Sequence, residues 1–195
     1  MQAFLVSLGV VAISEIGDKT QLLALMLAAR FRKPIPIILG IIVATVFNHA
    51  LAGAVGSWVA AQAGPEIMRW VLGLLFIGMG AWALIPDKLD EDDKPKDAST
   101  TMQIFTVTTV AFFLAEIGDK TQIATAALAA RFDSIVAVVL GTTLGMLVAD
   151  VPAVLFGNVA GERARGAWVR YIAAGLFILI GLVTILAVDL PSFGG

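Results

Sequence analysis

Glu15-Ile16-Gly17-Asp18-Lys19-Thr20-Gln21 lies in the middle of an apolar segment, and the same seven residues return as Glu116-Ile117-Gly118-Asp119-Lys120-Thr121-Gln122. We call residues 15–21 the first motif and residues 116–122 the second motif; they are 101 residues apart. An Asp or Lys at the centre of a membrane helix costs roughly 2.5–3.5 kcal/mol on insertion scales, and such residues mark functional sites. Because the same seven residues carry this cost twice, we expect one site built from two matching halves.

The composition around the motifs is typical of an integral membrane protein. Of the 195 residues, 59% are hydrophobic and 14% are charged, whereas soluble domains carry about 25% charged residues. The net charge of −2 gives no indication of nucleic-acid binding, and the absence of cysteine excludes disulfides and thiolate metal sites. The expected partner of the chain is therefore the lipid bilayer, and the sequence does not specify an oligomeric state.

Six apolar segments can be read along the chain, each long enough for the ~20 residues that cross a bilayer. Charged or Pro/Gly-containing stretches separate them. They cover approximately residues 4–29, 35–61, 67–85, 102–130, 134–160 and 167–188.

The repeat extends beyond the motifs, because residues 15–31 and 116–132 share 12 identities in 17 positions. We expect a first three-helix repeat over 1–86, an acidic cytoplasmic linker over 87–101 and a second three-helix repeat over 102–195. Since three is odd, the second repeat enters the membrane from the opposite side. The predicted fold is all-α and polytopic, with six transmembrane helices in two inverted-topology repeats, as in many secondary transporters.

The distribution of basic residues predicts an orientation. Loops after the first, third and fifth segments hold most of the Lys and Arg residues, whereas the opposite side holds Arg69 and Arg131. By the positive-inside rule the basic side is cytoplasmic, so both termini are expected on the extracytoplasmic side. The basic residues that define this side are Arg30, Arg32, Lys33, Lys88, Lys94, Lys96, Arg163 and Arg165.

The residue types of the motifs indicate a site for a hard divalent cation. On a continuous helix, residues three and four apart share a face, which would place Glu15, Asp18 and Lys19 on one side. An inverted repeat would bring both motifs together near the bilayer centre, with four carboxylates in one cavity. Oxygen donors of this kind suit Ca²⁺, Mg²⁺ and Mn²⁺. The expected metal ligands are Glu15, Asp18, Gln21, Glu116, Asp119 and Gln122, with Lys19, Thr20, Lys120 and Thr121 in supporting or proton-coupling roles.

Three details of the site follow from the same residues. Gly17 and Gly118 are expected to let each helix unwind slightly and offer backbone carbonyls. Each motif lysine is expected to pair, in the metal-free site, with the glutamate four residues before it. Protons and metal would compete for the same carboxylate oxygens, which is the physical basis of cation/proton antiport.

A second pair of polar positions comes from the repeat. Asn48 and His49 align with Ala149 and Asp150, 101 residues later. One interpretation is a proton-handling or gating pair beside the cation site. The other is a histidine that is hydrogen-bonded inside the bundle and an aspartate near a helix end. The sequence leaves both open.

The doubled Glu-x-Gly-Asp-Lys-Thr pattern, at Glu15–Thr20 and Glu116–Thr121, resembles the signature of the GDT-type family of cation/proton exchangers. That family includes Golgi and chloroplast manganese/calcium transporters and small bacterial manganese exporters. The resemblance covers essentially the whole chain. It implies a multi-pass protein of the cell (inner) membrane that exports Mn²⁺, with Ca²⁺ as a second substrate, in exchange for protons. It carries the role of cation ligand onto Glu15, Asp18, Glu116 and Asp119, with no cofactor other than the transported ion.

Two alternatives stay open from the residues alone. A divalent-cation channel or uniporter would use the same carboxylates without proton coupling. A non-transporting membrane scaffold would use the motifs as interhelical ion pairs. An enzyme is not expected, because the chain shows neither a Ser/His nor a Cys/His pairing nor a dedicated domain for chemistry.

Overall fold

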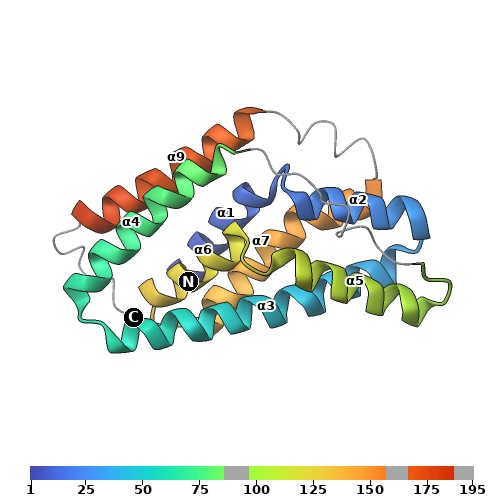
Figure 1. Cartoon of the computed structure of the whole chain (residues 1–195), viewed down its shortest axis with the longest axis horizontal. Helices are drawn as coiled ribbons and strands as arrows, with labels where there is room; N and C mark the ends of the chain where they lie inside the picture. The colour runs from blue at the N-terminus through green and yellow to red at the C-terminus, as the bar shows by residue number, and fades with distance from the viewer. Residues whose placement is uncertain (86–96, 157–166, 187–195) are drawn as a thin grey trace.

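The computed structural model describes residues 1–85, 97–156 and 167–186, and in these ranges all regular elements are helices (Figure 1). This confirms the all-α prediction. Most of the predicted linker, 87–96, lies outside the described residues, as do 157–166 and 187–195. The helices are α1 (Gln2–Glu15), α2 (Lys19–Phe31), α3 (Pro34–Gln62), α4 (Pro65–Ala83), α5 (Thr101–Glu116), α6 (Lys120–Arg131), α7 (Ile135–Phe156) and α9 (Ala167–Leu186).

Local sequence signals set several helix ends. Pro34 and Pro65 occupy the first turn of α3 and α4, where the missing N–H of proline costs nothing. Thr100 and Gln103 form a capping box at the start of α5, in which each side chain accepts a hydrogen bond from the other residue's backbone. The long helices therefore begin where the sequence provides a start signal.

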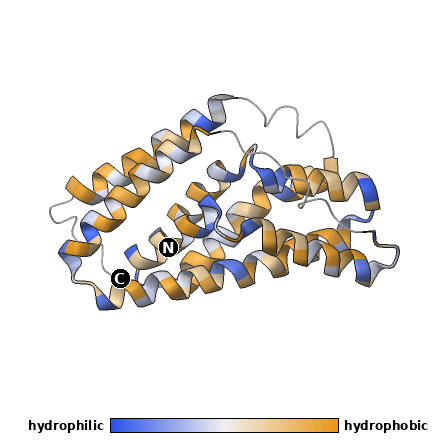
Figure 2. Cartoon of the chain, in the orientation of Figure 1, coloured by the Kyte–Doolittle hydropathy of each residue, from blue (hydrophilic) through white to orange (hydrophobic). Residues whose placement is uncertain are grey.

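The helices belong to a membrane protein. By length and apolar composition α3, α4 and α7 can each cross a bilayer, and the bent pair α5–α6 raises the count to four. Helix α1 and the Arg170–Leu186 part of α9 are shorter apolar helices. Large apolar side chains such as Phe47, Val148 and Leu179 are exposed, and apolar residues follow the helices along most of their length (Figure 2). Exposed apolar surface on this scale is what a lipid-facing protein presents.

The two halves of the chain interlock. Helices α1 and α2 of the first half pack against α7 of the second, and α5 and α6 of the second half pack against α3 of the first. The remaining helices, α4 and α9, pack against each other (Figure 1). The broken helices of each half thus pack against the long unbroken helix of the other half, α7 or α3.

Close helix contacts in the first half recur in the second, 101 residues on. A Cβ added at Gly40 would lie 2.8 Å from the Cβ of Thr108, and one at Gly141 would lie 2.9 Å from the Cβ of Ser7. Glycine at both positions lets the helices approach closely, as small residues do in membranes. The repeat in the sequence is therefore also a repeat in helix packing.

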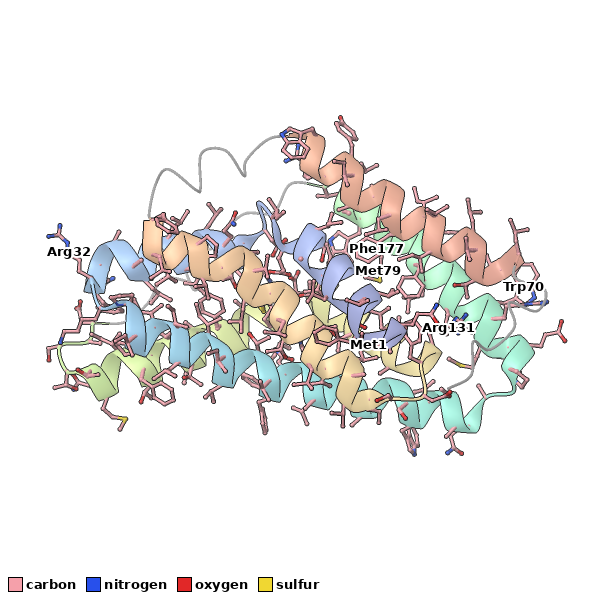
Figure 3. All side chains as sticks on the ribbon, turned by 180° about the vertical axis from the view of Figure 1, so that it is seen from behind. Met1, Arg32, Trp70, Met79, Arg131 and Phe177 are labelled. Carbon is pink, nitrogen blue, oxygen red and sulfur yellow. The ribbon has the colours of Figure 1, made fainter. Side chains whose placement is uncertain are left out.

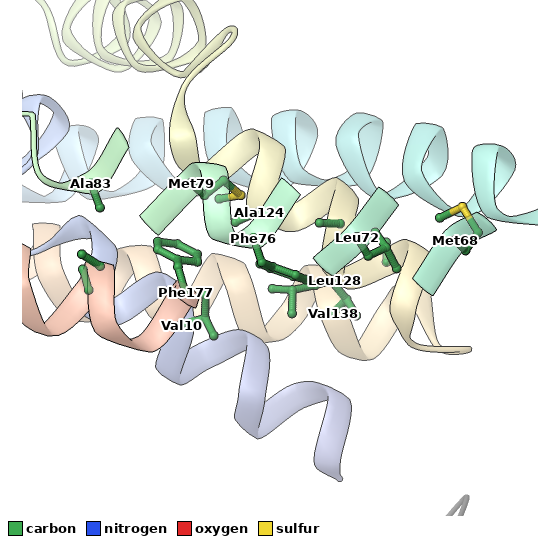
Figure 4. Packing of buried hydrophobic residues seen from close by; sticks show 14 residues of the cluster. Val10, Met68, Leu72, Phe76, Met79, Ala83, Ala124, Leu128, Val138 and Phe177 are labelled. Atoms are coloured by element: carbon green, nitrogen blue, oxygen red, sulfur yellow. The ribbon is translucent and has the colours of Figure 1, made fainter. Parts of the chain in front are cut away.

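Two hydrophobic clusters stabilise this arrangement. One lies where α4 and α9 cover α1 and α6, and it contains Val10, Leu72, Phe76, Leu128 and Phe177 (Figure 4). The other is formed by α1, α2, α3, α5 and α7. The two motifs lie at the breaks between α1 and α2 and between α5 and α6.

Candidate metal centre

Each motif lies at a break between two helices. Helix α1 ends at Glu15 and α2 begins at Lys19, while α5 ends at Glu116 and α6 begins at Lys120. The expectation of a single continuous helix through each motif, with Glu15, Asp18 and Lys19 on one face, is therefore wrong. The second pair of helices is bent by 71°.

Glycine permits both breaks. The φ angle is +83° at Gly17 and +74° at Gly118, in the left-handed region that glycine adopts without the steric cost of a Cβ. The predicted unwinding at these two glycines is confirmed. It is larger than expected, because the helix direction changes within three residues.

Side chains of the motif itself stabilise each break in the same way. The hydroxyl of Thr20 donates to Glu15 Oε2 at 2.6 Å, and that of Thr121 donates to Glu116 Oε2 at 2.8 Å. Each threonine therefore bridges the break and fixes the orientation of its glutamate. In both motifs this leaves the second glutamate oxygen, Oε1, buried and without a hydrogen-bond partner in the described part of the chain.

The glutamines also close the breaks. The backbone N–H of Gly17 donates to Gln21 Oε1 at 3.0 Å, and that of Gly118 donates to Gln122 Oε1 at 2.7 Å. These two amide oxygens, predicted as metal ligands, thus accept backbone hydrogen bonds in this structure. A carbonyl oxygen has two lone pairs, so this bond does not use up their capacity to bind a cation.

The amide nitrogens of the same glutamines tie each motif to the opposite half. Gln21 Nε2 donates to the backbone oxygen of Ala149 at 3.0 Å, and Gln122 Nε2 donates to Oδ1 of Asn48. Asn48 and Ala149 are equivalent positions in the repeat. Both motifs are therefore anchored to the middle of α3 or α7, next to His49 and Asp150.

Ion pairs connect the two motifs to each other. Lys120 Nζ lies 3.1 Å from Asp18 Oδ1, and Lys19 Nζ lies 3.8 Å from Asp119 Oδ1. The predicted pairing of each lysine with the glutamate of its own motif is replaced by a pairing with the aspartate of the other motif. The helix break is the reason, because the i,i+4 geometry that would align Glu15 with Lys19 requires a continuous helix.

Three carboxylates converge at this crossing. One oxygen each of Glu15, Asp18 and Asp119 lies within 4.8 Å of the others, and all three residues are buried. Glu116 is not part of this trio, but it is fully buried and close enough to interact electrostatically with Glu15. The expected meeting of four carboxylates is thus realised as a tight group of three with the fourth beside it.

Asp150 joins the same group of carboxylates. It is fully buried, it interacts electrostatically with Glu15 and Glu116, and neither of its oxygens has a hydrogen-bond partner in the described residues. His49 is equally buried, and both of its ring nitrogens are without a hydrogen-bond partner in the same ranges. The repeat had identified both positions, and one of its two interpretations placed them beside the cation site. The other interpretation, a histidine hydrogen-bonded inside the bundle, does not match His49 in the described residues.

The charge balance of the centre defines what it can do. Five buried carboxylates lie in or beside the centre, with the ammonium groups of Lys19 and Lys120 and with Arg170, which lines a small cavity together with Asp18 and Lys120. Buried charges in this ratio require additional positive charge, because an uncompensated carboxylate in a medium of low dielectric constant is very costly. Either a cation or protons can supply that charge.

Comparison with known proteins agrees with this chemistry. Residues 3–91 and 104–190 match the model of the family described as "Divalent cation/proton antiporter GDT1". The chain belongs to the GDT1 family. The expected resemblance to GDT-type cation/proton exchangers is confirmed, and each matched region of this GDT1 protein contains one motif.

Several proteins are similar over nearly the whole chain. One from Vibrio cholerae, named "Putative manganese exporter", is 49% identical over 185 residues, which cover 94% of this chain and 90% of that protein. "GDT1-like protein 5" of Arabidopsis thaliana is 27% identical over 226 residues, covering 95% of this chain and 96% of that protein. "Protein PAM71-homolog, chloroplastic", also from Arabidopsis thaliana, is 26% identical over 217 residues, covering 95% of this chain and 59% of that protein. No solved structure matches this GDT1 protein.

Proposed function

We propose that this GDT1 protein is a secondary transporter that exchanges Mn²⁺, with Ca²⁺ as a second substrate, for protons and exports the metal from the cytoplasm. One observation carries the proposal: the crossed pairs of Lys120 with Asp18 and Lys19 with Asp119 hold the two motifs together around buried carboxylates. A site of this kind can bind and release one divalent ion at mid-membrane.

Metal binding would use the converging oxygens. Glu15, Asp18 and Asp119 supply three carboxylate donors, and hard cations bind such oxygens at about 2.0–2.6 Å. If these three carboxylates closed around an ion, the ion would displace the lysines from the aspartates, because ammonium and metal compete for the same oxygens. Glu15 Oε1 is available for this role, since Thr20 binds only Oε2.

Proton coupling follows from the same charge balance. When the metal leaves, the buried carboxylates again outnumber the basic groups of the centre, and protons can replace the lost positive charge. A proton-loaded site binds metal poorly, and a bound metal ion disfavours protonation of the carboxylates that hold it and of those beside it. Each ion therefore excludes the other, which gives exchange. Asp150, close to both glutamates, is the proposed additional proton acceptor, and His49, at the equivalent position of the first repeat, is proposed to share this role.

The proposed substrate rests on donor chemistry and on relatives. The atoms that the acidic and amide side chains of the centre can offer to a metal are oxygens, and oxygen ligands suit Mn²⁺, Ca²⁺ and Mg²⁺. A relative that is 49% identical bears the name of a manganese exporter. Manganese is therefore the first substrate to test.

The proposed topology is the inverted repeat of six spans in the inner membrane, with both termini extracytoplasmic. In this arrangement α1–α2 and α5–α6 are each one broken span. Arg32 lies at one end of the molecule, and Trp70 and Arg131 lie at the other (Figure 3). The basic end that contains Arg32 would be cytoplasmic.

Flux measured in proteoliposomes tests the proposal. Vesicles that contain purified protein and a luminal pH dye would receive Mn²⁺, Ca²⁺ or Mg²⁺, with Glu15→Gln and Glu116→Gln alongside. Glu66→Gln is the matched control, because Glu66 is an exposed carboxylate at the start of α4. Metal-dependent proton movement that is lost in both site variants and kept in the control is the expected result.

Two other results would change the assignment. Metal flux without proton movement would identify a channel or uniporter. No flux in a folded wild-type sample would leave the crossed ion pairs with a purely structural role.

A further inference from the structure

Helices α4 and α9 form a tightly packed pair with matched contacts on both sides. The rings of Phe76 and Phe177, which are equivalent positions in the repeat, stack with centroids 6.4 Å apart. A Cβ added at Gly80 would lie 2.9 Å from the backbone oxygen of Ala174, and one at Gly181 would lie 2.6 Å from that of Gly73. Within the pair, the contacts of Gly80 with Ala174 and of Gly181 with Gly73 are equivalent in the repeat, so the pair is symmetric.

The position of this pair on the other six helices does not follow the repeat. Helix α4 packs on α6, and α9 packs on α1. The equivalent contacts would be α9 on α2 and α4 on α5, and in the described ranges neither is packed to a comparable degree. The pair therefore covers one of two equivalent surfaces.

Side-chain exposure shows the uncovered surface directly. On α1, Val10 is 3% exposed and Ile13 packs against the cluster beneath the pair. On α5, Leu114, the equivalent of Ile13, is 60% exposed, and Ile117 after its end is 54% exposed. Leu114 and Ile117 are the equivalents of Ile13 and Ile16, and the pair does not cover them, whereas Ala111, the equivalent of Val10, is partly buried against the other cluster.

The pair also lies over the glycine of the first motif and not over that of the second. A cavity of about 20 Å³ lies under its end and is lined by Ile16, Asp18, Lys120, Arg170 and Ala173, among others. Gly17 also lines this small cavity, whereas its equivalent Gly118 is exposed. The two helix breaks are therefore covered unequally, although Glu116 and Asp119 of the second motif are buried.

We propose that the α4–α9 pair is the moving gate of the transporter and that α1–α3 with α5–α7 form the fixed core that carries the centre. The gate exchanges its place on α1 and α6 for the equivalent place on α2 and α5. This inference rests on the proposed transport function. The pseudo-symmetry supports the exchange on α5, where Leu114 is the exposed equivalent of Ile13 on α1. On α2 the equivalents of Ala124 and Leu128 are Leu23 and Leu27, which are already buried in the other cluster.

This division of the molecule differs from rocking of one three-helix repeat against the other. Helix α4 belongs to the first repeat and α9 to the second, so rocking of the repeats would separate Phe76 from Phe177. In the gate mechanism that contact persists, and the contact between α9 and α1 breaks. Cross-links can distinguish the two, and the natural chain has no cysteine to interfere.

Three double-cysteine variants make the test. Ile16→Cys with Ala173→Cys joins α9 to the core in the observed arrangement, because both residues line the small cavity. Leu72→Cys with Ile117→Cys occupies the equivalent positions and reports the proposed second arrangement. Gly73→Cys with Ile185→Cys joins α4 to α9, because a Cβ at Gly73 would lie 2.2 Å from Ile185 Cγ1 and 2.8 Å from Ile185 Cδ1, and both of these atoms are absent from a cysteine at 185.

Oxidation in membranes, scored on gels, gives cross-link yields without reference to transport. The proposal expects both the 16–173 and the 72–117 pairs to form, in proportions that Mn²⁺ or pH shifts. It expects oxidation of the 16–173 pair to abolish Mn²⁺/H⁺ exchange and reductant to restore it. The 73–185 cross-link should leave exchange unchanged.

The opposite pattern would overturn the gate. A 73–185 cross-link that blocks exchange would favour rocking of the repeats. A 72–117 pair that never forms would show that the second surface is not used, while transport by the reduced proteins would still support the proposed function. Single-cysteine variants under the same oxidation control for loss of activity through the substitutions themselves.

Discussion

The ammonium nitrogen of Lys120 lies 3.1 Å from a carboxylate oxygen of Asp18, which belongs to the other copy of the motif. Its counterpart, Lys19 with Asp119, is longer at 3.8 Å, and the Lys19 side chain is 21% exposed against 6% for Lys120. The two equivalent ion pairs thus differ in distance and burial. The difference agrees with the one-sided position of the α4–α9 pair.

Replacing Lys120 by Met should destabilise the metal-free protein, because it leaves Asp18 as a buried charge without its ammonium partner. Removal of one partner of a buried ion pair costs about 3–5 kcal/mol. Lys19→Met should cost less, since Lys19 is more exposed. Thermal unfolding in detergent with a chelator measures both effects, and equal unfolding temperatures of the wild type and the two variants would contradict this prediction.

Added Mn²⁺ should restore more stability in Lys120→Met than in wild type, because the ion replaces the missing charge.

Replacing Thr20 or Thr121 by Val should weaken metal binding and leave the fold intact. Each hydroxyl orients a glutamate across the helix break, and loss of such an outer-shell hydrogen bond typically lowers metal affinity by about 10–100-fold. Calorimetric titration with Mn²⁺ measures the effect. Thr109→Val is the control, because the Thr109 hydroxyl donates to Phe105 O within α5. An unchanged affinity in both motif variants would rule out this orienting role.

Replacing Gly118 by Ala should lower stability through the backbone alone. No atom lies within 4 Å of a Cβ added there, but its φ is +74°, and a left-handed conformation costs an L-residue about 1–2 kcal/mol. Gly17→Ala should behave in the same way, since its φ is +83°. Gly9→Ala is the control, because Gly9 lies inside α1 with open space around it. A midpoint of thermal unfolding that is unchanged for Gly118→Ala and Gly17→Ala would contradict the strain argument.

Apparent affinity for Mn²⁺ should fall as the pH falls, because the carboxylates must lose their protons before they can bind metal. Stabilisation by a fixed Mn²⁺ concentration, measured over a pH series, gives the dependence. Asp150→Asn should make the dependence shallower by removing one of the competing proton sites near Glu15 and Glu116. Glu66→Gln should follow the wild-type curve. A steeper or unchanged dependence in Asp150→Asn would exclude Asp150 from proton coupling.

Much of this protein could be predicted from residue types and spacing. The doubled motif identified the buried acidic residues of the centre, and apolar composition identified a helical membrane protein. Such properties depend on local sequence, because an apolar segment must form a helix in lipid and a charge within it must find a partner. Gly17 and Gly118 also predicted the helix breaks from the sequence alone, because glycine, which has no Cβ, is the residue that most easily leaves the helical conformation.

The partners of those residues could not be predicted in the same way. Lys120 pairs with Asp18 rather than with Glu116, Asp150 lies near both glutamates, and α4–α9 covers α1 rather than α5. The ion-pair partners depend on how the helix breaks change the directions of the motif side chains. The cover of α1 depends on which of two equivalent surfaces the α4–α9 pair occupies. A repeat in sequence makes the two surfaces similar in composition, so the choice between them comes from packing across the whole molecule.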